Sequence, residues 1–407
     1  MKKHLLVTGS LLLSSALSFG AGYQLNLQGL RQLAMGGTGT AVPWDVSTIF
    51  YNPGALAQID NFQVNASALA IMPKVRYVQS PGTYTADAEE QTFIPFNVYI
   101  GSPIAYKSRT HIGVGVYTPF GTGINWGNNW AGRYLVQDIT LKSVFIQPTI
   151  SYKISDAVSV GGGLIYAMGN MEMHRAVPLT NENLSDGNVE FKGDGKGWGF
   201  NLGVHWTASE RVQIGLTYRS QVNMKVNRGY ARFSVPPSVS ASFPYTVFST
   251  TLPLPQVVSA GIGFKANDNL TLTADVNVTG WGAYKELAFD FEQPAIRDTR
   301  SPRNYRTTFA VRGGANYDFS DRLAGMIGAA WDRSPVRNGY VTPELPDADR
   351  GVFTAGISYK PFERVTFNAV AEFVTTDARK ASFDAENFSG IYRITAFTPG
   401  VGFTFDF

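Results

Sequence analysis

The 407-residue sequence contains no cysteine, which excludes disulfides, thiolate metal ligands and cysteine nucleophiles together. Histidine is scarce, with four residues, and no Ser–His pairing that would suggest a hydrolase can be read from the sequence. The 34 lysines and arginines nearly balance the 31 aspartates and glutamates, so the charge does not point to nucleic acid. We therefore expect a protein that is not an enzyme, with no cofactor, no metal site and no nucleic-acid partner.

Long hydrophobic runs are also missing, except near the N-terminus. Two lysines precede a mostly apolar stretch at residues 5–19, and Ser18 and Gly20 supply small residues for cleavage. This pattern is typical of a secretory signal peptide, which we assign to residues 1–20. The stretch is too short and too interrupted to span a membrane as a helix. The rest of the chain offers no other candidate for a spanning helix.

What the sequence does contain is alternation with a period of two. At the C-terminus Val401, Phe403, Phe405 and Phe407 share one face, opposite glycine, threonine and aspartate. An alternating strand that runs to the last residue is typical of the closing strand of an outer-membrane barrel; the alternative is an edge strand of a soluble sandwich. Fourteen alternating segments can be counted, at 61–72, 93–101, 109–119, 141–154, 158–172, 196–208, 211–228, 253–265, 269–283, 303–319, 322–335, 350–360, 363–376 and 389–407.

The connections between these segments alternate in length. Tight polar turns such as 155–157 and 208–210 follow the even segments, whereas long loops such as 173–195 and 229–252 follow the odd ones. An even strand count with short turns on one rim and long loops on the other is the pattern of a transmembrane barrel. The sequence therefore predicts an all-β protein whose residues 61–407 form a 14-stranded antiparallel transmembrane β-barrel.

Residues 21–60 precede the first strand and are too many for a simple tail. A barrel of fourteen strands would leave a wide lumen, and plugged lumens are known among such barrels. We therefore expect residues 21–60 to form a hatch that plugs the lumen. The alternative is an extension into the periplasm.

Several motifs resemble the FadL family of outer-membrane transporters of hydrophobic compounds. They are the mature start at 21–26, the segment Tyr51-Asn52-Pro53-Gly54, the loop 129–134 and the Pro-Asp-x-Asp-Arg segment at 346–350. The family usually has Asn-Pro-Ala where this chain has Gly54. The resemblance implies a monomeric barrel with a hatch in the outer membrane of a Gram-negative bacterium. It also implies passive uptake of long-chain fatty acids or other hydrophobic molecules.

Two alternatives to fatty-acid uptake stay open. Relatives that handle aromatic hydrocarbons share this architecture, and a general porin for hydrophilic solutes would have a similar barrel. A porin predicts sizeable ion conductance, whereas a transporter with a plugged lumen predicts little. The partners that we expect are a long-chain fatty acid or other hydrophobic small molecule, outer-membrane lipid with lipopolysaccharide, and the barrel-assembly machinery acting through the C-terminal strand.

Two long loops carry more apolar side chains than an outer loop needs, and we expect them to capture the ligand. The alternative is that these residues form an aromatic girdle and pack the loops, with no role in ligand binding. The candidate ligand-binding residues are Phe120, Trp126, Trp130, Phe233, Phe243, Tyr245, Phe248 and Leu252.

A fatty acid also needs a partner for its carboxylate. Arg306 and Arg312 fall on the even, lumen-facing set of the tenth segment and are the candidate carboxylate-binding residues. The alternative role for them is salt bridging inside the lumen, for example with Asp275.

Release is expected through the barrel wall. The resemblance implies that the third strand bends and opens a lateral route. There, Gly113, Gly115 and Pro119 would weaken the pairing of the ladder. We expect the Asn52-Pro53-Gly54 turn of the hatch to face this strand, so that hatch and wall together form the exit.

Overall fold

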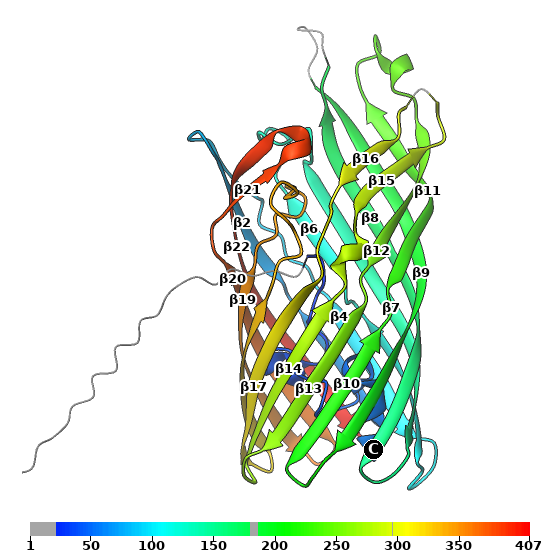
Figure 1. The fold of residues 1–407 in the computed structure, drawn as a ribbon, viewed down its shortest axis with the longest axis vertical. Coiled ribbons are helices and arrows are strands. Elements are labelled where there is room, and N and C mark those ends of the chain that lie inside the picture. The colour runs from blue at the N-terminus through cyan, green and yellow to red at the C-terminus, as the bar shows by residue number, and fades with distance from the viewer. Residues whose placement is uncertain (1–21, 180–185, 295) are drawn as a thin grey trace, which may run out of the picture.

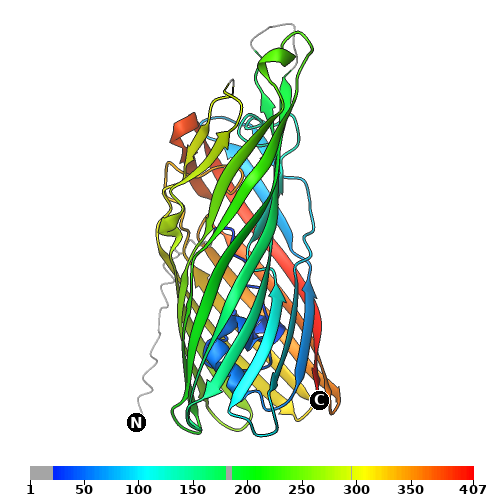
Figure 2. The ribbon, with the colours of Figure 1, turned by 90° about the vertical axis from the view of Figure 1, so that its right-hand side faces the viewer.

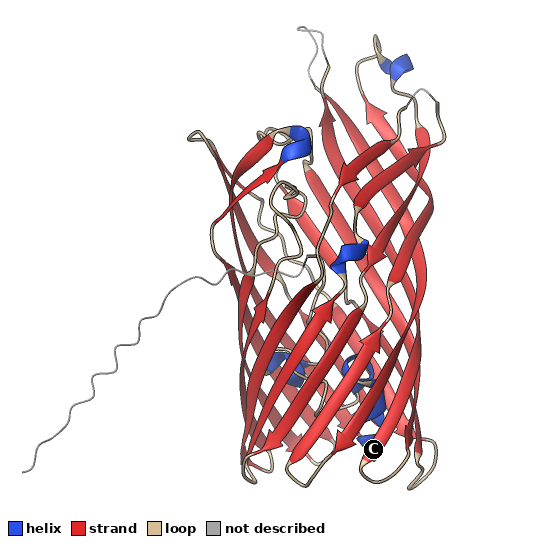
Figure 3. Cartoon of the chain, viewed as in Figure 1, coloured by secondary structure: helices blue, strands red, loops and turns tan. Residues whose placement is uncertain are grey.

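The computed structural model describes residues 22–179, 186–294 and 296–407. The signal peptide predicted at residues 1–20 lies outside them. The described residues form 22 strand segments joined in one antiparallel sheet, with few helices (Figures 1 and 3). No helix among them is long and apolar enough to cross a membrane.

Segments that continue one another make fourteen barrel strands, which confirms the predicted closed antiparallel barrel. In chain order the barrel strands are β1 (Gln63–Leu69) with β2 (Met72–Gln79), β3 (Thr85–Asp87) with β4 (Phe96–Pro103), β5 (Thr110–Tyr117) with β6 (Gly121–Asn125), β7 (Asp138–Lys153), β8 (Val158–Val177), β9 (Gly187–Thr207), β10 (Val212–Arg219) with β11 (Val222–Ser234), β12 (Thr246–Leu254) with β13 (Val257–Lys265), β14 (Leu270–Thr279) with β15 (Glu286–Phe291), β16 (Thr299–Pro302) with β17 (Thr308–Ser320), β18 (Leu323–Asp332), β19 (Arg350–Phe362), β20 (Val365–Thr376) with β21 (Arg379–Phe383), and β22 (Phe388–Asp406).

The last strand closes the sheet against the first. β22 pairs antiparallel with β1, from Gln63 opposite Asp406 to Leu69 opposite Gly400. The amide of Phe407 donates to the carbonyl of Phe62 at 3.0 Å, so pairing continues to the final residue. Closure matters because lipid offers no hydrogen-bond partner to an open strand edge.

The two faces of the sheet differ as the alternation predicted. Large apolar side chains such as Leu164, Ile327 and Phe353 point outward and are exposed. Polar side chains such as Asn65, Gln147 and Asn201 are buried in the lumen. The outer face is therefore suited to lipid, and the inner face to hydrogen bonding with whatever fills the barrel.

The barrel rims differ in height. Short turns gather at one rim, with the C-terminus, and the long connections gather at the other (Figure 1). β8 and β9 are 20 and 21 residues long and rise well above most of the wall (Figure 2). The predicted loop at 173–195 is thus wrong over much of its length, because both strands continue into it.

Residues 22–60 lie inside the barrel, with their helices near the short-turn rim (Figure 2) and their start higher up, where Gly22 bonds to Asp347 in the loop before β19. They contain α1 (Leu30–Ala34), α2 (Thr48–Tyr51) and the 3₁₀ helix η1 (Pro53–Gln58). Three short 3₁₀ helices lie elsewhere: η2 (Ser240–Ser242) and η4 (Asp384–Glu386) are in long connections, and η3 (Trp281–Ala283) interrupts the ninth barrel strand between β14 and β15.

One carboxylate of the wall holds the hatch. Asp275 Oδ2 accepts hydrogen bonds from the amides of Gly39 and Thr40 at 2.9 and 3.0 Å and from Thr40 Oγ1 at 2.7 Å. Asn52 adds a second anchor, because its Nδ2 donates to the carbonyl of Val204 on β9 at 3.0 Å. The hatch is therefore fixed by directional hydrogen bonds to the wall as well as by packing.

Candidate functional site

The ladder between the second and third barrel strands is interrupted. β4 and β5 pair from Pro103 opposite His111 up to Asn97 opposite Tyr117. Beyond that point β6 pairs only with β7, and the ladder with the second strand is lost. Contact returns where the amide of Glu89 donates to the carbonyl of Asn125 at 2.7 Å.

We call the gap between these two points the wall window; it lies between residues 90–96 and 118–124. Pro119 stands at its lower end, and proline has no amide hydrogen with which to pair across it. The Asn125 side chain closes the upper end with a 2.6 Å hydrogen bond to Glu89.

The start of the hatch replaces the missing partner from inside. Leu25 donates its amide to the carbonyl of Pro119 at 2.8 Å, and Gly121 donates to the carbonyl of Tyr23 at 3.0 Å. Gln24 and Phe120 form an antiparallel bridge between these bonds. The bend of the third strand is therefore held by residues 23–25 of the hatch.

Two cavities meet behind this bend. The inner cavity, of about 80 Å³, lies within the lumen and is lined mainly by apolar side chains, among them Tyr23, Met171, Leu252 and Tyr284. The wall cavity, of about 570 Å³, shares Phe120 with it and extends through the wall window.

The wall cavity reaches the outer surface of the barrel. Its lining includes Ile94 and Phe96, which are 70% and 41% exposed. On the lumen side it is lined by charged residues, including Arg312, Asp332 and Glu372. Its volume falls in the range of small-molecule sites, and it connects the lumen with the lipid-facing surface.

The eight aromatic and aliphatic residues predicted to bind ligand fall into separate groups. Phe120 and Leu252 line the inner cavity. Trp126 and Trp130 are buried and stacked on each other, with ring centroids 4.6 Å apart. Trp126 also donates its indole N–H to the carbonyl of Pro343 at 2.9 Å, which ties its loop to the connection before β19.

The other four lie along the outer extension of the wall. Phe233 packs on Phe243 with ring centroids 5.5 Å apart, and Tyr245 is exposed beside Tyr230. Phe248 is fully buried among other phenylalanines. None of these four lines either cavity in the described part of the chain.

The two candidate arginines have different surroundings. Arg312 lies in β17, borders the wall cavity and donates to the hatch carbonyl of Gly36 at 3.1 Å. Its Nη2 also lies 3.4 Å from Asp332 Oδ2. Arg306 precedes β17 instead of lying within a strand, and its Nε donates to the carbonyl of Ser334 at 3.2 Å.

The structure places the predicted exit residues at different heights. Gly113 and Gly115 lie in the continuous ladder below the wall window, where a Cβ on Gly113 would come 2.6 Å from Ile49 of the hatch. Pro119 borders the window itself. The hatch surface against these glycines is therefore Ile49, whereas Asn52 bonds to β9 on another side.

Gly54 departs from the usual family residue for a reason that the structure explains. A Cβ at this position would lie 2.6 Å from the carbonyl oxygen of Gly203 in β9. The hatch approaches the wall so closely here that alanine would force the two apart.

Sequence reasoning missed Arg303, which lines the inner cavity and is almost fully buried beside Tyr284. Its guanidinium forms an ion pair with Glu344. Arg303 begins the segment predicted as the tenth strand but falls on its odd set, so the even, lumen-facing criterion that selected Arg306 excluded it.

Asp347 links the start of the hatch to the loop before β19. Its Oδ2 accepts hydrogen bonds from the amide of Gly22 at 3.2 Å and from Ser334 Oγ at 2.8 Å. Burial raises the pKa of Asp347 to about 6. This carboxyl therefore takes up a proton at a higher pH than an ordinary aspartate does.

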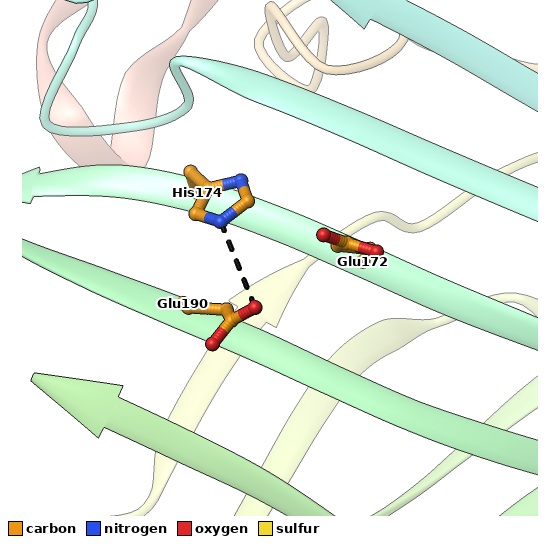
Figure 4. A group of neighbouring side chains, drawn as sticks. All are labelled: Glu172, His174 and Glu190. Atoms are coloured by element: carbon orange, nitrogen blue, oxygen red, sulfur yellow. Dashed lines mark ion pairs between the residues drawn. The ribbon is translucent and has the colours of Figure 1, made fainter.

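A histidine–carboxylate cluster on the outer extension could in principle hold a metal. Glu172, His174 and Glu190 place one ligand atom each within 4.8 Å of one another (Figure 4). Each carboxylate already faces a cation, because Lys192 lies 3.0 Å from Glu172 and Arg232 lies 3.9 Å from Glu190. We interpret the group as a ladder of ion pairs.

A closed barrel with an N-terminal segment inside it and a cavity that opens through its wall defines a plugged barrel of the outer-membrane type. The family model described as "Outer membrane protein transport protein (OMPP1/FadL/TodX)" matches residues 11–407. The chain belongs to this family, whose members are transport proteins and not enzymes. It is thus an outer-membrane transporter of hydrophobic compounds from a Gram-negative bacterium.

Individual relatives agree with this assignment. The long-chain fatty acid transport protein of Salmonella typhi is 24% identical over 378 residues, covering 85% of each chain. A FadL homologue of Pseudomonas aeruginosa has a TM-score of 0.83 and 19% identity over 95% of this chain and 100% of that one. The toluene transporter TodX of P. putida has a TM-score of 0.75 and 15% identity over 93% and 98%.

Proposed function

We propose that this protein takes up long-chain fatty acids by passive diffusion and releases them sideways through the wall window. The observation that carries the proposal is the wall cavity, which joins the lumen to the exposed side chains of Ile94 and Phe96. A lateral route suits an apolar ligand, because it leads into lipid and never requires transfer into water.

The chemistry of the cavities supports an amphipathic ligand. Apolar residues such as Met171, Leu252 and Leu254 would surround an acyl chain in the inner cavity. Arg303 there and Arg312 in the wall cavity supply cations for a carboxylate, although each now faces an acidic residue. The ligand carboxylate would have to compete with those partners.

Capture is proposed at the outer rim, where Phe233 lies at the end of β11 and Phe243 and Tyr245 lie in the long connection to β12. Trp126 and Trp130 would then line the way inward. This assignment rests on their apolar character and on the loop position.

The route can be tested with one cysteine, because the native chain has none. Ile94→Cys, labelled with a bulky maleimide, should lose uptake of a fluorescent fatty acid in cells, whereas the unlabelled variant should keep it. The matched control is Ile327→Cys, which is 64% exposed on β18, away from the wall window. Full uptake by the labelled Ile94→Cys protein would refute the lateral route.

Uptake of aromatic hydrocarbons is the second candidate function. The small inner cavity of about 80 Å³ favours a compact ligand, and the solved relative TodX is named a toluene transporter. Binding of a long-chain acid, the corresponding alcohol and toluene should be compared in wild type and in the Arg306→Ala/Arg312→Ala variant. Selective weakening of the acid supports fatty-acid uptake; equal loss for all three refutes a carboxylate site at these arginines.

A further inference from the structure

The outer surface of β8, β9 and β11 changes character at one height. Met171 and Phe191 point into the lumen, so the residues next to them in sequence face outward. Low on this surface the outward side chains are apolar, as at Leu202. Tyr166 and Trp198 then form an aromatic cross-strand pair with ring centroids 4.7 Å apart.

This aromatic pair marks the upper boundary of the lipid-facing band. Tyrosine and tryptophan are enriched where the hydrocarbon of a membrane meets the headgroups. The next outward residue of β9 is Lys196. Lys196 is exposed, and because it is one outward position above Trp198 it lies at the level of the lipid headgroups.

Lys196 has an unusual neighbour. It stands directly opposite Lys225 of β11 in the register of the sheet, and Lys225 is also exposed. Arg228 follows at the bulge in β11 and is exposed as well. Like charges placed directly opposite each other destabilise a sheet, so an anion bound between them would stabilise this arrangement.

One carboxylate, that of Asp194, is exposed two residues above Lys196 on the same outward face of β9, but it forms no ion pair with these cations in the described residues. None of Lys196, Lys225 and Arg228 has an acidic partner within 4.0 Å there. The cations farther out on the same surface do have partners: Lys192 faces Glu172, and Arg232 faces Glu190. On the described outer surface of β8, β9 and β11, cations without an ion-pair partner therefore lie at the headgroup level, where anionic lipid groups are available.

We propose that Lys196, Lys225 and Arg228 bind a phosphate of the lipopolysaccharide in the outer leaflet. Lysine and arginine are the side chains that recognise phosphate, through charge-assisted hydrogen bonds. The acyl chains of the same lipid would lie against Tyr166, Trp198 and the apolar band below. The site is on the outside of the barrel and is independent of the proposed fatty-acid route.

The test uses the full-length mature protein, purified in detergent and stripped of lipid. Native mass spectrometry measures binding of bisphosphorylated lipid A and of its dephosphorylated form. The test variant is Lys196→Gln/Lys225→Gln, and a Lys196→Arg/Lys225→Arg variant keeps both charges. The control is Lys265→Gln/Arg322→Gln, which removes the same charge at the short-turn rim.

Wild type should bind the phosphorylated lipid about tenfold or more tightly than the dephosphorylated one, because two or three charge-assisted contacts depend on phosphate. The glutamine variant should lose this preference, whereas the arginine variant and the control should keep it. Unchanged preference in the glutamine variant would overturn the proposal. So would displacement of the lipid by equimolar inorganic phosphate, because the site would then be one for free phosphate.

Discussion

Removing the Asp275 carboxylate should release part of the hatch without unfolding the barrel. This side chain accepts three hydrogen bonds from Gly39 and Thr40. It is not among the residues that line the inner cavity or the wall cavity. A hydrogen bond to a charged group contributes about 1.5–3 kcal/mol, and neighbouring contributions are not additive. We therefore expect Asp275→Ala to weaken docking of residues 39–40 by about 3–4 kcal/mol.

That loss corresponds to about a 10²–10³-fold increase in the open population, since 1.4 kcal/mol is tenfold. The direct assay is hydrogen exchange of the amides of Gly39 and Thr40, which should lose protection by the same factor. Barrel amides such as those of β8 should be unaffected. Single-channel recording is the second readout, and brief conducting events should appear if the hatch fills the lumen.

The control is Asp268→Ala, which removes a carboxylate from an exposed turn at the short-turn rim. Heat-modified mobility in gel electrophoresis verifies that both variants remain folded barrels. Unchanged exchange at residues 39–40 in a folded Asp275→Ala protein would refute the assignment of this carboxylate as the hatch anchor.

Three further predictions concern other contacts of the hatch and loops. The pKa of Asp347 is raised in the folded protein, so ionisation of this carboxyl opposes folding, and lowering the pH from 7 to 5 should raise the Tm of wild type relative to that of Asp347→Asn. A difference in Tm that does not change with pH would contradict this. Gly54→Ala should lower the Tm through its clash with β9, while Gly282→Ala, whose nearest contact would be 3.5 Å away, should not; equal Tm values would contradict the clash. Trp126→Ala should slow fatty-acid uptake, measured by uptake kinetics, and should destabilise its loop by about 3–5 kcal/mol, as for other buried tryptophans, measured by hydrogen exchange. Unchanged uptake would place Trp126 outside the route.

The barrel could be predicted from the sequence because its membrane band keeps one phase of alternation. Leu164 faces lipid and Asn201 faces the lumen, so each strand reads as apolar outside and polar inside. Above the band this phase inverts: Phe191 is buried inside while Glu190 and Lys192 face water. Strands in which the apolar side chains stay on the outer face end at that inversion. The upper parts of β8 and β9 were therefore predicted as a loop.

The site was harder to predict because its residues are brought together by the hatch. Pro119 signals a weak point in the third strand, and its position at the wall window agrees with that signal. Gly113 and Gly115 give the same local signal, yet their ladder is intact and packs on Ile49. Sequence alone could not separate a glycine that weakens pairing from one that makes room for a plug.

The geometry of the wall window links its stability to the position of the hatch. The amide of Gly121 and the carbonyl of Pro119 have no partner on the second strand and are satisfied by Tyr23 and Leu25. A backbone group left without a partner away from water costs about 1–3 kcal/mol, and these groups lie beside an apolar cavity. Residues 23–25 therefore cannot leave the bend unless water or a polar part of a ligand takes their place. A ligand carboxylate could accept from Gly121 but could not donate to Pro119, so a complete exchange also needs a donor, which water can supply.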